Sequence, residues 1–87
     1  MTMENENKEN SVQYPCTWHY RIIGMDKDSL YLAALENVNK EFIHTPGKQS
    51  SGGKYHSINI EIEVEHQEER DLIFQALQRD SRIKFVL

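Results

Sequence analysis

The most regular pattern of hydrophobic and polar residues covers residues 58–65. Its apolar members alternate with polar ones: Ile58, Ile60, Ile62 and Val64 against Asn59, Glu61, Glu63 and Glu65. A period of two is typical of a β-strand with one buried face and one open face. Residues 16–23 alternate in the same way and follow Pro15, whose missing N–H does least harm just before a strand. Both segments are therefore predicted to be strands.

Two other segments repeat apolar residues at helical spacing. The first begins after Asp26 or Asp28, whose side chains can cap a helix, and is predicted to run to about Phe42. The second is predicted over residues 67–79, with acidic side chains in its first turn, where the helix dipole favours them. The apolar stripes are Leu30, Ala33, Ala34, Leu35 and Val38 in the first helix, and Leu72, Ile73, Ala76 and Leu77 in the second.

Two more strands complete the pattern. One begins at Ile43, and because the proline at position 46 cannot donate to a ladder, this strand is predicted to lie at a sheet edge or to be irregular. A Ser-Ser-Gly-Gly loop then reverses the chain, and the last strand covers residues 82–87. The order βαββαβ places both helices on one face of an antiparallel sheet, and right-handed crossovers favour the strand order 4-1-3-2. The sequence thus predicts an α+β, ferredoxin-like sandwich.

Composition separates the start of the chain from the rest. Residues 1–13 are rich in Glu and Asn, so they cannot bury enough apolar surface to offset the entropy of ordering. We predict a disordered acidic tail over residues 1–13 and a single domain over residues 14–87. Without a signal-like segment, a membrane-spanning run or a second cysteine beside Cys16, we expect a cytoplasmic location and no membrane partner. A chain this short buries a small core, which is compatible with a homodimer.

The acidic charge of the chain and the polar face of the 58–65 strand argue against nucleic-acid binding. The chain has a formal charge of −4, whereas binding to nucleic acid relies on basic surface. RNA-recognition domains share this topology but stack bases on aromatic residues, where this chain has Glu61 and Glu63. We therefore expect no nucleic-acid partner. Basic side chains from neighbouring strands are expected to face these carboxylates: Arg21, Arg82 and Lys84.

No constellation of residues indicates catalysis or metal binding. The four histidines, His19, His44, His56 and His66, do not have a metal-ligand spacing. Cys16 has no reactive motif around it and is assigned to packing. We therefore predict no catalytic residue, no metal and no cofactor, which is the pattern of a protein that is not an enzyme.

The loop before the 58–65 strand is the candidate ligand site. Residues 42–60 contain no Asp or Glu, although the chain has 14 acidic residues. Glycine backbone N–H groups can cradle an anion, and serine hydroxyls and basic side chains add donors and charge. The predicted weak anion site consists of Lys48, Ser50, Ser51, Gly52, Gly53, Lys54 and His56. The alternative is an ordinary hairpin loop, because Gly and Ser also simply make turns.

The same loop carries a family resemblance. The pattern Lys-x-Ser-Ser-x-Gly-x-Tyr-His-Ser over residues 48–57 precedes an alternating strand, a helix and a closing Val86-Leu87. This combination resembles the small bacterial YbeD-like family of unknown function. The resemblance covers roughly residues 14–87. It implies a fold similar to ACT domains, which regulate metabolic enzymes by binding small molecules, and it implies no established activity.

Three functions are compatible with these observations. The leading hypothesis is a non-enzymatic regulatory or adaptor domain that senses a small anionic metabolite or docks on a protein partner. The second is a small enzyme whose site assembles across a homodimer from Ser51, Lys54 and His56. The third is a protein-interaction module without a ligand.

Overall fold

The computed structural model describes residues 12–48 and 51–87. Its elements follow the predicted order: β1 (Cys16–Gly24), α1 (Lys27–Asn37), β2 (Ile43–Pro46), β3 (His56–Val64), α2 (Gln67–Arg79) and β4 (Phe85–Val86). A 3-10 turn, η2 (Ser51–Gly53), lies between β2 and β3. Most of the predicted tail over residues 1–13 lies outside the described residues, and Val12 and Gln13 at its end are exposed.

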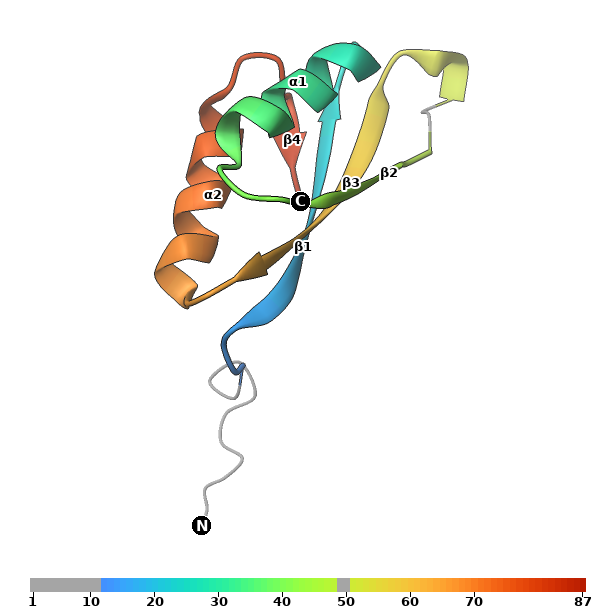
Figure 1. The fold of residues 1–87 in the computed structure, drawn as a ribbon. Coiled ribbons are helices and arrows are strands. Elements are labelled where there is room, and N and C mark those ends of the chain that lie inside the picture. The colour runs from blue at the N-terminus through green and yellow to red at the C-terminus, as the bar shows by residue number, and fades with distance from the viewer. Residues whose placement is uncertain (1–11, 49–50) are drawn as a thin grey trace.

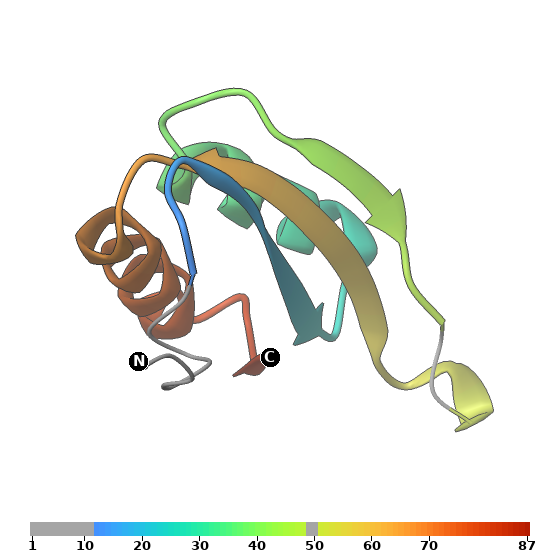
Figure 2. The same ribbon diagram turned by 90° about the horizontal axis from the view of Figure 1, so that it is seen from below.

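The four strands form one antiparallel sheet in the order β2-β3-β1-β4. This is the predicted order 4-1-3-2 read from the opposite edge, so the ferredoxin-like α+β prediction is confirmed. Both helices lie on one face of the sheet, and the other face carries no helix (Figures 1 and 2). The long central ladder joins β1 to β3 from the Cys16–Val64 pair to the Gly24–His56 pair.

A single apolar core fills the space between the sheet and the helices. The alternating residues of β1 and β3 that point toward the helices are buried, and Ile22, Ile60 and Val64 are 0% exposed. Leu30 of α1 and Leu77 of α2 close the core from the other side and are also fully buried. Burying such side chains is the main favourable term in folding, worth about 1.5–3 kcal/mol each.

The first helix ends at Asn37, so the prediction that it runs to about Phe42 is wrong. Val38 has an extended backbone, with φ −112° and ψ 115°, although its N–H still donates to the carbonyl of Ala34 at 3.0 Å. The Asn37 side chain donates to the Ala33 carbonyl at 2.8 Å and to the Asp80 carboxylate at 2.9 Å. Asn side chains compete with the helical backbone in this way, and here the competition coincides with the helix end.

The last strand is shorter than the predicted 82–87. Asp80 follows α2, and its carboxylate accepts from both the backbone N–H and the side chain of Arg82 at 2.9 Å. The guanidinium of Arg82 also pairs with Glu36 of α1 at 2.7 Å. Arg82 is therefore held at the helix ends, and the expectation that it faces the carboxylates of β3 is wrong.

Within residues 12–48 and 51–87, no helix has the length and apolar character needed to cross a bilayer.

Candidate functional site

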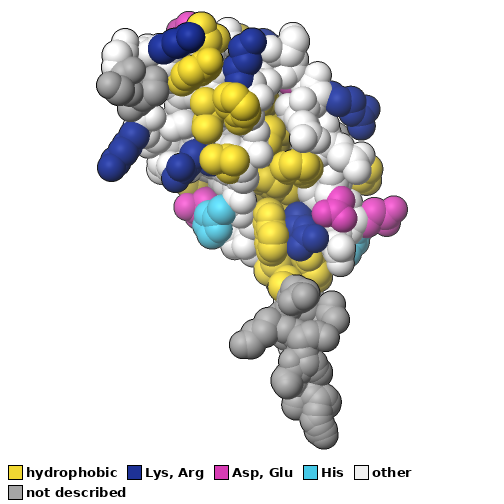
Figure 3. Space-filling view, turned by 180° about the vertical axis from the view of Figure 1, so that it is seen from behind, with side chains coloured by type: hydrophobic (Ala, Val, Ile, Leu, Met, Phe, Trp, Pro, Cys, Tyr) yellow, Lys and Arg dark blue, Asp and Glu magenta, His cyan; other side chains and the backbone are white. Residues whose placement is uncertain are grey.

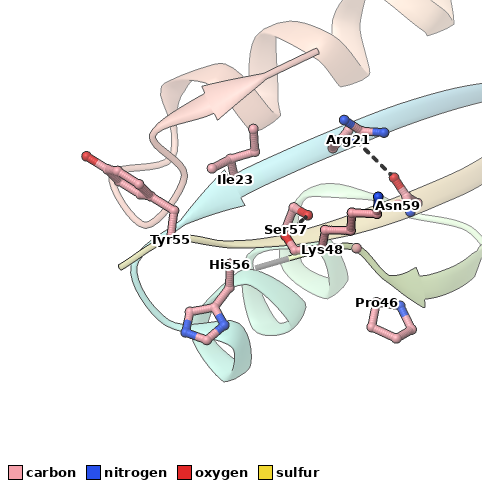
Figure 4. Close-up of a pocket in the computed structure, with 9 residues that line it drawn as sticks. Arg21, Ile23, Pro46, Lys48, Tyr55, His56, Ser57 and Asn59 are labelled. Carbon is pink, nitrogen blue, oxygen red and sulfur yellow. Dashed lines mark hydrogen bonds between the residues drawn. The ribbon is translucent and has the colours of Figure 1, made fainter. Parts of the chain in front are cut away.

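The open face of the sheet carries a hollow at the end where the loop after β2 meets β1 and β3. The hollow has a volume of about 640 Å³, and we call it the sheet-end hollow. It is lined by residues of β1, of β3 and of the segments beside them: Arg21, Ile23, Pro46, Gly47, Lys48, Tyr55, His56, Ser57 and Asn59. Arg21 and Asn59 lie toward one end of it, and Ile23 and Tyr55 lie toward the other (Figure 4).

The antiparallel register of β1 and β3 brings these side chains together. Arg21 pairs with Asn59 and Ile23 pairs with Ser57, so all four project from the face that the helices do not cover. The Nε of Arg21 donates to Asn59 Oδ1 at 3.3 Å, which holds the guanidinium over the sheet (Figure 4). The sheet therefore supplies a fixed cation at the floor of the hollow.

Gly47 brings the loop against β3. Its N–H donates to the Ser57 carbonyl at 2.8 Å. A Cβ on Gly47 would clash with Ser57 Oγ, because it would lie closer than real Cβ atoms approach another atom. Ser57 is 9% exposed, and its hydroxyl donates to the Lys48 carbonyl at 3.1 Å. Glycine at position 47 thus allows Lys48 to lie over the sheet beside Asn59 (Figure 4).

The charge of the hollow is positive. None of the residues that line it is an Asp or a Glu. In the part of the chain that the structure describes, neither Arg21 nor Lys48 forms a salt bridge with a carboxylate. Two cations therefore face a solvent-open hollow in a chain whose formal charge is −4.

The structure separates the predicted site residues into groups. Lys48 and His56 line the hollow, whereas Lys54 places its ammonium 5.4 Å from the centre of the Tyr55 ring. Gly52 and Gly53 adopt positive φ angles of 84° and 71° in η2, as expected for turn glycines. Ser51 begins η2, and Ser50 lies outside the described residues.

His56 lines two hollows, the sheet-end hollow and a smaller one near the start of α1. Its ring points toward α1, away from the Arg21–Asn59 pair (Figure 4). It also lines a second hollow of about 330 Å³ together with Lys27. At the start of α1, hydrogen bonds from Ser29 hold the pKa of Asp26 below its usual value, and the nearby His56 adds a smaller contribution in the same direction.

Sequence reasoning missed the floor and the apolar wall of the hollow. It placed Arg21 and Asn59 on the open face, but it did not connect them with the loop. The alternation of both strands could have paired them only if the register had been known, because a shift of one residue exchanges the two faces. Ile23 and Tyr55 gave no signal in the sequence, since each is an ordinary strand or loop residue by itself.

Metal binding has no geometric support in the described residues. Across residues 12–48 and 51–87, no three His, Cys, Asp or Glu side chains gather closely enough to hold an ion. The only carboxylate–histidine contact among the salt bridges described joins His19 to Glu61 at 3.8 Å. The chemistry of the sheet-end hollow is therefore that of hydrogen bonding and charge.

Comparisons with known proteins agree with the resemblance carried by the loop. A family model described as "Protein of unknown function (DUF493)" matches residues 9–87. A UPF0250 protein of Neisseria gonorrhoeae is 33% identical over 92 residues, which cover 97% of this chain and 98% of that protein. An uncharacterized protein of Helicobacter pylori is 32% identical over 82 residues, covering 93% of this chain and 95% of its own length.

A solved structure extends the comparison to three dimensions. The solution structure of a Helicobacter pylori protein superposes with a TM-score of 0.79 at 30% identity, and it covers 100% of this chain and 97% of that one. Sequence and structure are thus similar over nearly the whole length of both chains. The chain belongs to the DUF493 family of proteins of unknown function, as the YbeD-like resemblance predicted.

Proposed function

We propose that this protein is a cytoplasmic, non-enzymatic domain that binds a small anionic metabolite in the sheet-end hollow. The observation that carries the proposal is that both Arg21 and Lys48 line a hollow with no acidic residue in its walls. Cations without a carboxylate partner attract anions, and a fixed guanidinium does so with a defined direction. Binding of the anion would be the event by which the domain regulates or recruits a protein partner.

The walls of the hollow also restrict the ligand. The guanidinium of Arg21 uses Nε for Asn59, and its two terminal nitrogens form no hydrogen bond with the described residues, so they suit a carboxylate or phosphate. Ile23 and Tyr55 add an apolar surface at the opposite end. A carboxylate or phosphate that carries an apolar group fits this division better than a bare inorganic anion.

The expected affinity is modest. The hollow is open to water, and salt screens exposed charges within about 10 Å at 0.1 M. Two screened cations supply only a few kcal/mol, which corresponds to a dissociation constant of roughly 1 mM. Such a site reports metabolite concentrations in the millimolar range, and its affinity falls as salt is added.

A protein-interaction role has its own observation in favour. Phe85 is 56% exposed and contacts the Tyr55 ring with their centroids 6.5 Å apart, next to the hollow. Hydrophobic side chains gather on this face of the molecule with Lys and Arg beside them (Figure 3). An adaptor that docks a partner here would use the same face, with or without the anion. The enzyme alternative has less support, because Lys54 contacts the Tyr55 ring whereas the ring of His56 points toward α1 (Figure 4).

Amide chemical shifts of the full chain test the proposal during titration with sodium phosphate and, separately, sodium butyrate at low salt. We expect selective changes in the amide chemical shifts of Arg21, Ser57 and Asn59, and butyrate should also change the shift of Ile23. The Arg21→Gln and Lys48→Gln variants should weaken binding, because each removes one charge from the hollow.

The matched control is Lys54→Gln, which removes the same charge from a lysine outside the hollow. Its response should remain close to that of the unmodified chain. Uniform small shifts over the whole surface, or an equal loss in all three variants, would contradict the site. Binding that disappears only in Lys54→Gln would move the site to the loop itself.

A further inference from the structure

One stretch of the sheet edge has backbone groups without partners. Arg21 exchanges two backbone hydrogen bonds with Leu87 on the side of β1 that faces away from β3. The Arg21 N–H donates to the Leu87 carbonyl at 3.1 Å, and the Leu87 N–H donates to the Arg21 carbonyl at 2.8 Å. Successive alternate residues of a strand point their backbone groups the same way, so Thr17 and His19 also face that side. β4 pairs only with Ile22 and Ile23 in register, and it lies beside one half of β1 (Figure 1). Among the described residues, none bonds the outward N–H or C=O of Thr17 or His19.

Several other backbone groups at the ends and edges of the sheet are covered. The carbonyl of Glu63, beyond the end of β2, accepts from Lys40 Nζ at 2.7 Å. The N–H of Glu65 donates to the Glu69 carboxylate at 2.7 Å. On the outer side of β2, Pro46 has no N–H to offer. Proteins protect sheet edges in these ways because the unpaired backbone groups of an edge can pair with another strand. No such protection covers the Thr17–His19 edge among the described residues.

An apolar hollow adjoins the unpaired edge. It has a volume of about 500 Å³ and is lined by Trp18, Tyr20, Phe74 and Leu87, together with Thr17 and His19 themselves. Its wall is held in place from α2, because the Arg70 guanidinium lies 4.5 Å from the centre of the Trp18 ring and donates to the Tyr14 hydroxyl at 3.1 Å. The hydroxyl of Tyr20 donates to the Arg70 carbonyl at 2.6 Å. The unpaired backbone groups of Thr17 and His19 thus lie directly beside this apolar hollow.

The unpaired edge and the apolar hollow together form a groove. Its charged neighbours on the open face are Arg21, His19 with Glu61 at 3.8 Å, and Glu63 opposite Thr17. Arg21 lies at the end nearest β4, and Arg70 lies over Trp18 and pairs with Asp71 at 3.3 Å. Arg21 has no carboxylate partner in the described part of the chain. A segment with an acidic residue near Arg21 and an apolar residue over the hollow is complementary to this surface.

We propose that this groove binds an extended, acidic peptide segment of a partner protein as an additional strand in line with β4. Running antiparallel to β1, the segment places one residue opposite His19 and another opposite Thr17, each exchanging two hydrogen bonds with its partner. The residue between them lies opposite Trp18 and points to the helix side of the sheet, into the apolar hollow. The site shares Arg21 with the sheet-end hollow. The strand pairing at Thr17 and His19 does not depend on anion binding.

The test uses the ¹⁵N-labelled full chain and the blocked peptide formyl-Glu-Val-Thr-Val-amide, which starts opposite His19 because Leu87 already lies opposite Arg21. In the proposed register the first and third residues direct their N–H groups at β1, and the second directs its side chain at Trp18. Peptide at ten times its Kd should slow hydrogen exchange at the Thr17 and His19 amides by about tenfold, because those amides exchange from the free protein. The amides of Ser57 and Asn59, which line the sheet-end hollow away from this edge, should not respond.

Two modified peptides provide the matched controls. N-methylation at the first and third residues removes the donors that face β1 and should abolish the protection. N-methylation at the second residue alters an N–H that points away from β1, and the protection should remain. Equal effects of the two modifications, no protection of Thr17 and His19 at any peptide concentration, or protection of both amides by self-association without peptide would each overturn the proposal.

Discussion

Asp80 joins the ends of both helices to the last strand, and replacing it with Asn tests how much this junction stabilises the fold. The Asp80 side chain is 12% exposed and accepts from Asn37 at 2.9 Å and from Arg82 Nη2 at 2.7 Å, both through Oδ2. Through Oδ1 it accepts from the backbone and the Nε of Arg82. An Asn side chain keeps the acceptor at one position but turns the other into a donor, which faces the donors of Asn37 and Arg82.

The expected loss follows from those contacts. A hydrogen bond to a charged group contributes about 1.5–3 kcal/mol, whereas an exposed ion pair contributes about 0–1 kcal/mol. Since Asp80 is largely buried and Arg82 is partly exposed, we expect Asp80→Asn to lower the free energy of unfolding by about 2 kcal/mol at pH 7. The matched control is Asp71→Asn, whose side chain is 51% exposed and pairs only with the adjacent Arg70 in the described chain. It should change stability by less than about 0.5 kcal/mol.

The effect should also depend on pH with a defined sign. Hydrogen bonds from the Arg82 side chain hold the pKa of Asp80 well below its usual range in the folded chain. A carboxyl with a lowered folded pKa contributes its full stability above its unfolded pKa, near 3.9, and loses it as pH falls toward the folded pKa. The difference between the chain and Asp80→Asn should therefore be constant from about pH 5 to 8 and shrink below about pH 4. Urea unfolding followed by circular dichroism measures it. Equal midpoints at pH 7, or a difference that does not shrink in acid, would refute this reasoning.

Three further predictions concern the core, the loop and a buried tyrosine. Ile60→Ala should cost roughly 2–5 kcal/mol and Glu61→Ala less than about 1 kcal/mol in urea unfolding, because Ile60 is 0% exposed and Glu61 lies on the open face; the reverse order would mean that the sheet faces are misassigned. Gly47→Ala should lower stability by about 1–3 kcal/mol through contact with Ser57 Oγ, and adding Ser57→Ala should recover part of the loss; no recovery would place the strain elsewhere. Burial raises the pKa of Tyr20 to about 12, so its ultraviolet titration should lag behind the other tyrosines and stability should fall above about pH 10, where the unfolded chain ionises first. Tyr20→Phe should remove the late step, and a titration with four equivalent tyrosines would contradict the burial of its hydroxyl.

The sequence by itself determined the elements and their arrangement. Alternation over residues 58–65 is confirmed as the central strand β3, and Pro46 is confirmed at a sheet edge. These features are local, because a period of two and a missing N–H constrain the chain whatever surrounds it. The strand order then followed from the βαββαβ pattern and the handedness of crossovers, which leave few alternatives.

The tertiary structure decided where elements end and which side chains meet. The end of α1 coincides with a bond between Asn37 and Asp80, which are 43 residues apart and show no mutual signal in the sequence. The sheet-end hollow arises from the register that sets Arg21 beside Asn59. The shortness of β4 leaves Thr17 and His19 at an open edge. Each of these depends on contacts between distant residues, and such contacts are set by strand register and packing, which local periodicity does not specify.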